Sequence, residues 1–228
     1  MELRTDHLTR QLDLIPLEEL DKTEVNVIGC GAIGSYLALS LVKMGIEKVK
    51  LWDMDDVSVE NMSNQFFRFK DIGKNKAEAL ADLIKEFTGV GVSAYPLEYL
   101  PLMTRQLKGI VVVAVDSMRA RTMIYESLVS SIHGVRVLID PRMSAEFYMQ
   151  YTVDLESHEW YKKSLYSDES AVAERCTAKS TIYTATLAAG MVTKTIKNIM
   201  LKQPHPKSVQ WDIAKSNNDS MSMHQGNC

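Results

Sequence analysis

The sequence of 228 residues is poor in cysteine and contains no long apolar segment. Its three cysteines, Cys30, Cys176 and Cys228, are odd in number and widely spaced, which argues against a disulfide framework. There is no Cys-x-x-Cys pair, and the five histidines show no metal-ligand spacing, so we expect no zinc. The longest strongly apolar run, residues 110–115, is too short to cross a bilayer.

The sequence also lacks an excess of charge of either sign. Lys and Arg number 26 against 29 Asp and Glu, and the net charge of −3 gives no basic field of the kind that marks nucleic-acid-binding proteins. Residues 1–16 are charged and have no apolar core of a secretory signal. We therefore expect a cytoplasmic protein with neither a membrane nor a nucleic acid as partner.

What is present is a regular alternation of strand and helix patterns. Residues 6–22 have apolar positions at helical spacing, and we expect one or two short helices interrupted by Pro16. Over residues 24–145 the expected strands are 25–28, 48–52, 92–96, 110–115 and 135–140, and the expected helices are 33–44, 74–87 and 119–132. Alternation at this spacing predicts a mainly parallel sheet.

After residue 145 the pattern changes. Residues 146–155 alternate like an antiparallel strand, 156–179 are polar and predict a long surface loop, 181–201 predict a helix, and 208–213 predict an edge strand. We expect the polar residues 216–228 to be a disordered tail. The prediction is thus a single α/β domain over 1–215. It has an N-terminal helical segment (1–23), a nucleotide-binding half (24–145), and a Rossmann-like doubly wound sheet that antiparallel strands continue.

The first chemical motif is a glycine-rich turn, Gly29-Cys30-Gly31-Ala32-Ile33-Gly34, between a predicted strand and a predicted helix. In a G-x-G-x-x-G turn the first glycine permits a tight turn and the second lets the backbone approach a phosphate. The third lets the helix pack closely on the strand, and the helix N-terminus supplies positive potential. The motif predicts a site for the phosphates of a nucleotide without saying which nucleotide.

Asp53 lies 19 residues beyond Gly34, at the end of the second predicted strand. A carboxylate at this place can accept hydrogen bonds from both ribose hydroxyls, as in NAD enzymes and in some ATP enzymes. The two cofactors therefore remain open on these residues alone.

Four further segments follow in order: Asp53-Met54-Asp55, Asn61 to Gln65, Gly73-x-x-Lys76, and Val115-Asp116-Ser117 with Arg121. On these residues the chain resembles the ThiF/MoeB/HesA adenylyltransferases, the ubiquitin-activating-like enzymes. The family pattern has Asp-x-Asp, Asn-x-x-Arg-Gln, Gly-x-x-Lys and Asp-Asn-x-x-x-Arg at these places. The resemblance covers residues from about 10 to 199, which is nearly the whole chain.

The resemblance implies that ATP and Mg²⁺ are used to activate the C-terminal carboxylate of a ubiquitin-like protein, a sulfur-carrier protein or a peptide. By position, Asp53 and Asp55 belong to the nucleotide site, with Asp53 on the ribose. Lys76 and Asn61 contact the phosphates, and Asp116 holds the magnesium.

Two more roles follow from the resemblance. Arg10 matches an arginine that reaches into the site of a partner subunit, which implies a homodimer, and Arg4 is a second candidate for that role. Cys176 stands where relatives carry a cysteine that forms thioester or persulfide links. Arg175 and the following helix N-terminus would favour its thiolate form.

The sequence departs from the family pattern at two positions. Asn64 stands where the family has an arginine, so a phosphate-binding charge is missing from its usual place, and Arg68 is a candidate replacement. Ser117 stands in place of an asparagine. Three alternatives therefore stay open: an NAD-dependent oxidoreductase, a catalytically silent scaffold or dimer partner, and an enzyme like the tRNA threonylcarbamoyladenosine dehydratases.

Overall fold

A computed structural model describes residues 6–166, 180–215 and 221–224. In this part of the chain an eight-stranded sheet has the order β3-β2-β1-β4-β5-β6-β7-β8. The first five strands pair in parallel: β1 (Glu24–Ile28), β2 (Lys48–Trp52), β3 (Ser93–Tyr95), β4 (Lys108–Val113) and β5 (Gly134–Ser144). The last three continue it antiparallel: β6 (Phe147–Asp154), β7 (Ser208–Asp212) and β8 (Met221–His224). The predicted Rossmann-like class is confirmed.

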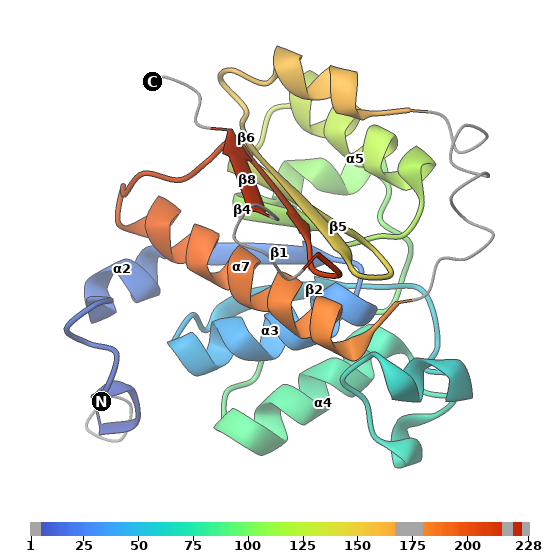
Figure 1. The fold of residues 1–228 in the computed structure, drawn as a ribbon. Helices are drawn as coiled ribbons and strands as arrows, with labels where there is room; N and C mark the ends of the chain where they lie inside the picture. The colour runs from blue at the N-terminus through green and yellow to red at the C-terminus, as the bar shows by residue number, and fades with distance from the viewer. Residues whose placement is uncertain (1–5, 167–179, 216–220, 225–228) are drawn as a thin grey trace.

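Helices cover both faces of the sheet (Figure 1). The α-helices are α2 (Leu17–Lys22), α3 (Ala32–Met44), α4 (Lys76–Thr88), α5 (Met118–Ser130) and α7 (Ile182–Met200). Short 3₁₀ helices are η1 (Val59–Ser63), η2 (Phe69–Asp71), η3 (Pro101–Gln106) and η4 (Glu159–Ser164). Figure 1 shows α3, α4 and α7 on one face and α5 on the other. None of the helices in the described ranges is long and apolar enough to cross a membrane.

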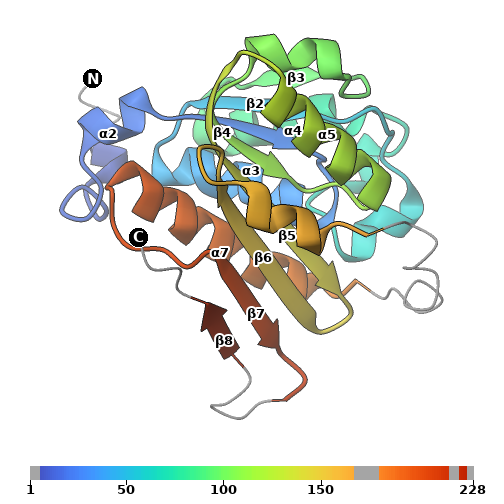
Figure 2. The same ribbon diagram turned by 90° about the horizontal axis from the view of Figure 1, so that it is seen from above.

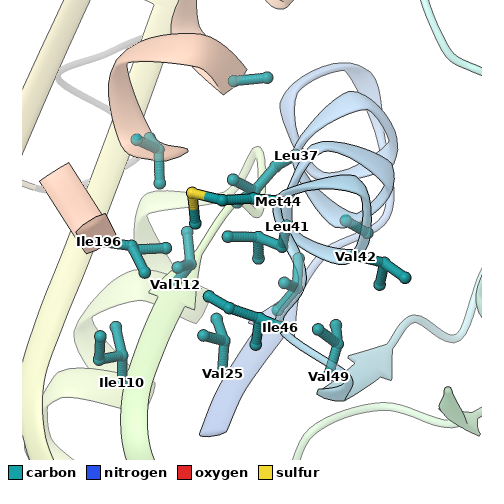
Figure 3. Close-up of a cluster of buried hydrophobic side chains, with 14 of the residues drawn as sticks. Val25, Leu37, Leu41, Val42, Met44, Ile46, Val49, Ile110, Val112 and Ile196 are labelled. Carbon is teal, nitrogen blue, oxygen red and sulfur yellow. The ribbon is translucent and has the colours of Figure 1, made fainter. Parts of the chain in front are cut away.

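The core beneath α3 and α7 is made of aliphatic side chains from the central strands (Figure 3). Val25 and Val112 of β1 and β4 pack there against Leu41 of α3 and Ile196 of α7, and all four are almost fully buried. A second cluster, around Trp52 and Tyr125, fills the space between the sheet and α5. Strands buried on both faces explain the continuous apolar run that the sequence shows over residues 110–113.

Local chemistry sets the start of α4 two residues later than the sequence pattern predicts. The side-chain oxygen of Asn75 accepts hydrogen bonds from the N–H groups of Ala77 and Glu78, at 2.9 and 3.3 Å, so Asn75 is the N-cap. The helix ends at Gly89, which has a φ of +75° and is the left-handed C-cap. Lys76 is therefore the first helical residue.

Two stretches predicted to lack regular structure contain some. Residues 159–164 form η4, because the ring of Tyr161 is buried against the sheet and its hydroxyl bonds to Asp140. Residues 221–224 form β8, which pairs antiparallel with β7 (Figure 2). The backbone groups at the edge of β7 offer partners for such a strand, so the prediction of disorder is wrong for these residues.

The strand predicted over 135–140 is also longer than expected, since β5 runs through Pro141 to Ser144. Pairing with β4 reaches only Ile139, so no neighbouring strand needs an N–H from Pro141 on that side. The extension carries Arg142 past the end of β4, on the side where the parallel strands end.

Candidate active site

A cavity of about 810 Å³ opens at the carboxyl ends of β1, β2 and β4, where the order of the strands reverses. Ligands of open α/β sheets bind at this point. Its walls come from the glycine loop, the segment after β2, the start of α4, the turn before α5, and Ser180 ahead of α7. The sequence-predicted residues that line it are Gly29, Gly31, Asp53, Asp55, Lys76 and Asp116.

Two of the three glycines in the loop are required for steric reasons, and the third leaves space. Gly29 has a φ of +96°, and a Cβ there would lie 2.6 Å from the carbonyl oxygen of Ala114. A Cβ on Gly34 would lie 1.9 Å from the carbonyl oxygen of Gly29, so Gly34 provides close packing behind the loop. A Cβ on Gly31 would meet only the Nε2 atom of Gln65, at 3.9 Å. The backbone at Gly31 is thus open to a ligand at the N-terminus of α3.

The carboxylate of Asp53 is held by two backbone amides. The N–H of Cys30 donates to Oδ2 at 2.7 Å, and the N–H of Asp55 donates to Oδ1 at 2.9 Å. Burial raises the pKa of Asp53, and the two amide donors oppose that shift. Each oxygen accepts one of these bonds and keeps further acceptor capacity, and Asp53 lines the cavity, so the carboxylate fits a pair of ribose hydroxyls.

Lys76 reaches the cavity from the first turn of α4. Its ammonium Nζ lies 2.9 Å from Oδ2 of Asp55, and its side chain is only 11% exposed. Its N–H donates to the carbonyl oxygen of Asp55 at 2.8 Å, and the amide of Asn75 donates to the carbonyls of Asp53 and Asp55. These bonds tie the start of α4 to the end of β2, so Lys76 and Asp53 face the same cavity.

Asp116 follows β4 and is exposed at the cavity wall. The guanidinium of Arg121 donates to the carbonyl oxygens of Val113 and Val115 and to Asp140, and these bonds fix the turn that carries Asp116. Over the described ranges there is no group of three or more His, Cys, Asp or Glu side chains that could hold a metal ion. Mg²⁺ needs only one or two carboxylates when nucleotide phosphates supply further ligands, and Asp116 fits that requirement.

Four side-chain atoms of wall residues are buried without a hydrogen-bond partner: Nε1 of Trp52, Oδ1 of Asn64, Oε1 of Gln65 and Oγ of Ser180. The amide nitrogen of Asn64 is 3.5 Å from the carbonyl oxygen of Ser180, so the segment after η1 meets the start of α7 here. Buried polar atoms normally have partners. Their grouping in one cavity indicates a wall that a polar ligand completes.

Several predicted residues lie elsewhere. Asn61 caps η1, its Oδ1 accepting the N–H of Ser58 at 2.9 Å, and it does not line the cavity. Arg68 is bound to Asp71 at 2.7 Å and to Glu86, so the structure does not place it where the arginine of the family is missing. Arg10 is exposed in the N-terminal segment and is absent from the cavity wall. Cys176 lies outside the described residues.

A buried ionic cluster at the cavity edge was not expected from the sequence. Asp140 is fully buried and accepts from Arg121, from Nε of Arg142 at 2.7 Å and from the hydroxyl of Tyr161 at 2.7 Å. Arg142 also donates to the carbonyl oxygen of Ser164 at 2.9 Å. Burial and the nearby carboxylate raise the pKa of Tyr161 well above its usual value. The Asp-Pro-Arg sequence is the one signal that could have drawn attention to this cluster.

Comparison with known proteins settles the family. A sequence model described as the ThiF family matches residues 7–228. The chain belongs to the ThiF family.

Among ThiF relatives, the NEDD8-activating enzyme E1 catalytic subunit of Caenorhabditis elegans is 38% identical over 80 residues, which are 34% of this chain and 19% of that protein. The tRNA threonylcarbamoyladenosine dehydratase of Escherichia coli is 41% identical over 61 residues, 26% of this chain and 23% of that protein. This chain therefore matches about a quarter or less of the length of these relatives.

A solved structure of E. coli MccB with ATP shares the ThiF fold, with a TM-score of 0.73 and 17% identity. The match covers 92% of this chain and 65% of that one. At this identity the likeness supports the fold.

Proposed function

We propose that the cavity binds ATP with Mg²⁺ and that the protein adenylates a carboxylate. The substrate would be the C-terminal carboxylate of a ubiquitin-like or sulfur-carrier protein, or of a peptide. The observation that carries the proposal is that Lys76 and Asp116 line the same cavity as the glycine loop and Asp53. An ATP site uses all four, whereas an NAD site leaves the lysine and the second aspartate without a role.

In the proposed reaction a carboxylate oxygen attacks the α-phosphorus of ATP, and the bond from that phosphorus to the bridging oxygen breaks. Pyrophosphate leaves with the bonding electrons, and an acyl adenylate remains. Two anions must meet in this step, so positive groups near the developing charge lower the barrier. Lys76 and the backbone amides at the start of α3 supply them.

Each wall of the cavity takes one part of the nucleotide. Asp53 accepts the ribose hydroxyls, and Gly31 leaves room for a phosphate against the backbone. Asp116 would hold Mg²⁺, which neutralises phosphate charge when bound. Asn64 offers an amide where the family has an arginine, Gln65 and Ser180 add an amide and a hydroxyl beside it, and their unpartnered atoms fit a polar ligand.

Two parts of the proposal depend on groups beyond the cavity. Arg10 is exposed and therefore available to the site of a second copy, which supports a homodimeric working unit. Cys176 would receive the acyl group in a thioester, releasing AMP. Since the E. coli tRNA threonylcarbamoyladenosine dehydratase shares 41% identity with this chain over 61 residues, dehydration of a modified tRNA adenosine is a second candidate function.

The test is exchange of labelled pyrophosphate into ATP in the presence of candidate carrier proteins, peptides and modified tRNA. We expect exchange with one carboxylate substrate and its loss in Asp116→Ala. For Cys176, we expect a thiol-labile adduct that disappears in Cys176→Ala while exchange persists. Absence of exchange with every carrier and peptide, together with binding of NAD, would contradict adenylation.

A further inference from the structure

Trp52 is the last residue of β2 and directly precedes Asp53. It is 1% exposed, it lines the nucleotide cavity, and its indole Nε1 is buried without a hydrogen-bond partner. An indole N–H can only donate, and buried tryptophans usually satisfy it. The N–H thus carries a desolvation penalty that the protein alone does not offset.

The indole is also held in one orientation. Its ring stacks on Tyr95 with centroids 4.0 Å apart and planes 8° apart. The ring of Tyr99 makes a T-shaped contact with it, with centroids 5.9 Å apart. Tyr99 is itself fixed by a 2.6 Å hydrogen bond between its hydroxyl and Thr104. Rotating the indole to find another acceptor would break this stack, so the N–H is pre-organised.

The residues around Trp52 indicate which part of a ligand carries the acceptor for its N–H. Ile28, Leu97 and Tyr99 line the cavity along with Trp52, and they give this wall an apolar and aromatic character. Such a wall suits a flat heterocycle better than a phosphate. Because Asp53 is the next residue and is proposed to hold the ribose, the base attached to that ribose lies within reach of Trp52.

The other unpartnered atoms of the cavity are of a different kind. Those of Asn64 and Gln65 are amide oxygens, which accept, and that of Ser180 is a hydroxyl, which does both. Along the described wall, Trp52 is the unpartnered buried group that demands an acceptor. Aromatic ring nitrogens of a purine are acceptors of this kind.

We propose that Trp52 is the residue that recognises the purine base, its indole N–H donating to a ring nitrogen of adenine. The inference rests on the proposed function, since it takes ATP as the ligand. It assigns base selectivity to the end of β2, next to the ribose site, and leaves the phosphates to the glycine loop and Lys76.

The experiment is calorimetric titration of the full chain, with Mg²⁺, using ATP and its 1-deaza, 3-deaza and 7-deaza analogues. Each analogue replaces one ring nitrogen by C–H. We expect one of the three to bind about tenfold more weakly than ATP, as for loss of one hydrogen bond. Trp52→Phe keeps an aromatic ring stacked on Tyr95. It should weaken the binding of ATP by a similar factor and leave the affinity for that one analogue unchanged.

Trp160→Phe is the matched control. Trp160 packs against Tyr151 and Tyr161 and does not line the cavity, so this variant should bind all four nucleotides as the parent does. Within each variant, the affinity of every analogue is expressed relative to that of ATP. A loss of stability would lower all four affinities together and would not change these ratios.

Two results would overturn the inference while leaving ATP binding intact. One is equal binding of ATP and all three analogues by the parent protein. The other is a Trp52→Phe variant that binds all four nucleotides more weakly by the same factor, which would indicate that Trp52 only packs against its neighbours. Failure of the parent to bind ATP at all would instead refute the proposed function, and with it the inference.

Discussion

The N–H of Cys30, in the glycine-rich loop, donates to Oδ2 of Asp53 at 2.7 Å. This bond joins the turn after β1 to the end of β2, so the predicted phosphate site and the predicted ribose site are directly connected. The carboxylate that makes this connection is also a charge removed from water, and burial raises its pKa despite the two amide donors.

The raised pKa of Asp53 makes stability depend on pH in a defined direction. A group whose folded pKa is raised contributes full stability below its unfolded pKa and loses that contribution as pH rises through the folded value. Asparagine does not titrate, so Asp53→Asn lacks this loss. As pH rises from about 3.9, the unfolded pKa, the free energy of unfolding of the variant minus that of the parent should therefore increase. Urea unfolding across this range measures the difference, and a difference that stays flat or falls with pH would contradict the burial of the charge.

Lys76 should matter for catalysis far more than for stability. Lys76→Gln removes a positive group from the proposed phosphate site, and we expect the rate of pyrophosphate exchange to fall by about 10²–10³. Because the partner carboxylate of Asp55 is 57% exposed, losing the ion pair should cost less than about 1 kcal/mol of unfolding free energy. The control is Lys74→Gln. Lys74 pairs with Asp71 at 3.2 Å and does not line the cavity, so an equal effect on exchange would exclude a special role for Lys76.

Two helical glycines should respond oppositely to the same substitution. Gly34→Ala places a Cβ 1.9 Å from the carbonyl oxygen of Gly29, and forcing the loop aside should cost about 3 kcal/mol or more, as for severe overpacking. Apart from the backbone of its own helix, no atom lies within 4 Å of the Cβ position at Gly190 in α7, so Gly190→Ala should stabilise by up to about 1 kcal/mol. Thermal unfolding distinguishes them, and similar melting temperatures would show that the packing of α3 on the loop is looser than described.

The buried cluster at Asp140 should be sensitive to loss of its charge. Asp140→Asn leaves the guanidiniums of Arg121 and Arg142 without a buried counter-charge, and breaking such a pair costs about 3–5 kcal/mol. Asp82→Asn, at an exposed position in α4, should change stability by no more than about 0.5 kcal/mol. Denaturant unfolding of both variants is the measurement. A loss at Asp140 no larger than at Asp82 would mean that the cluster is not a coupled unit.

The parallel half of the fold could be predicted from the sequence because its strands are buried on both faces and appear as short apolar runs. The later elements depend on partners that are distant along the chain. The 3₁₀ helix η4 exists because Tyr161 bonds to Asp140, 21 residues earlier, and no local pattern contains that contact. β8 depends on the free edge of β7 in the same way.

The same difference between local patterns and distant contacts applies to the residues of the site. Gly31, Asp53, Lys76 and Asp116 lie at strand ends and helix starts, and strand order alone brings them to one cavity. Asn61 and Arg68 lie on the irregular segment between β2 and α4, where local hydrogen bonds and Asp71 decide their directions. Trp52 looks in the sequence like one more apolar strand residue, and its unpartnered N–H is visible only when the packing around it is known.

The most direct test of the central claim is calorimetric binding of ATP and of NAD to the intact chain, each with and without Mg²⁺. We expect ATP to bind, its affinity to rise with Mg²⁺, and that rise to be lost in Asp116→Asn, while NAD gives no binding heat. Binding of NAD in the absence of any binding of ATP would contradict the account.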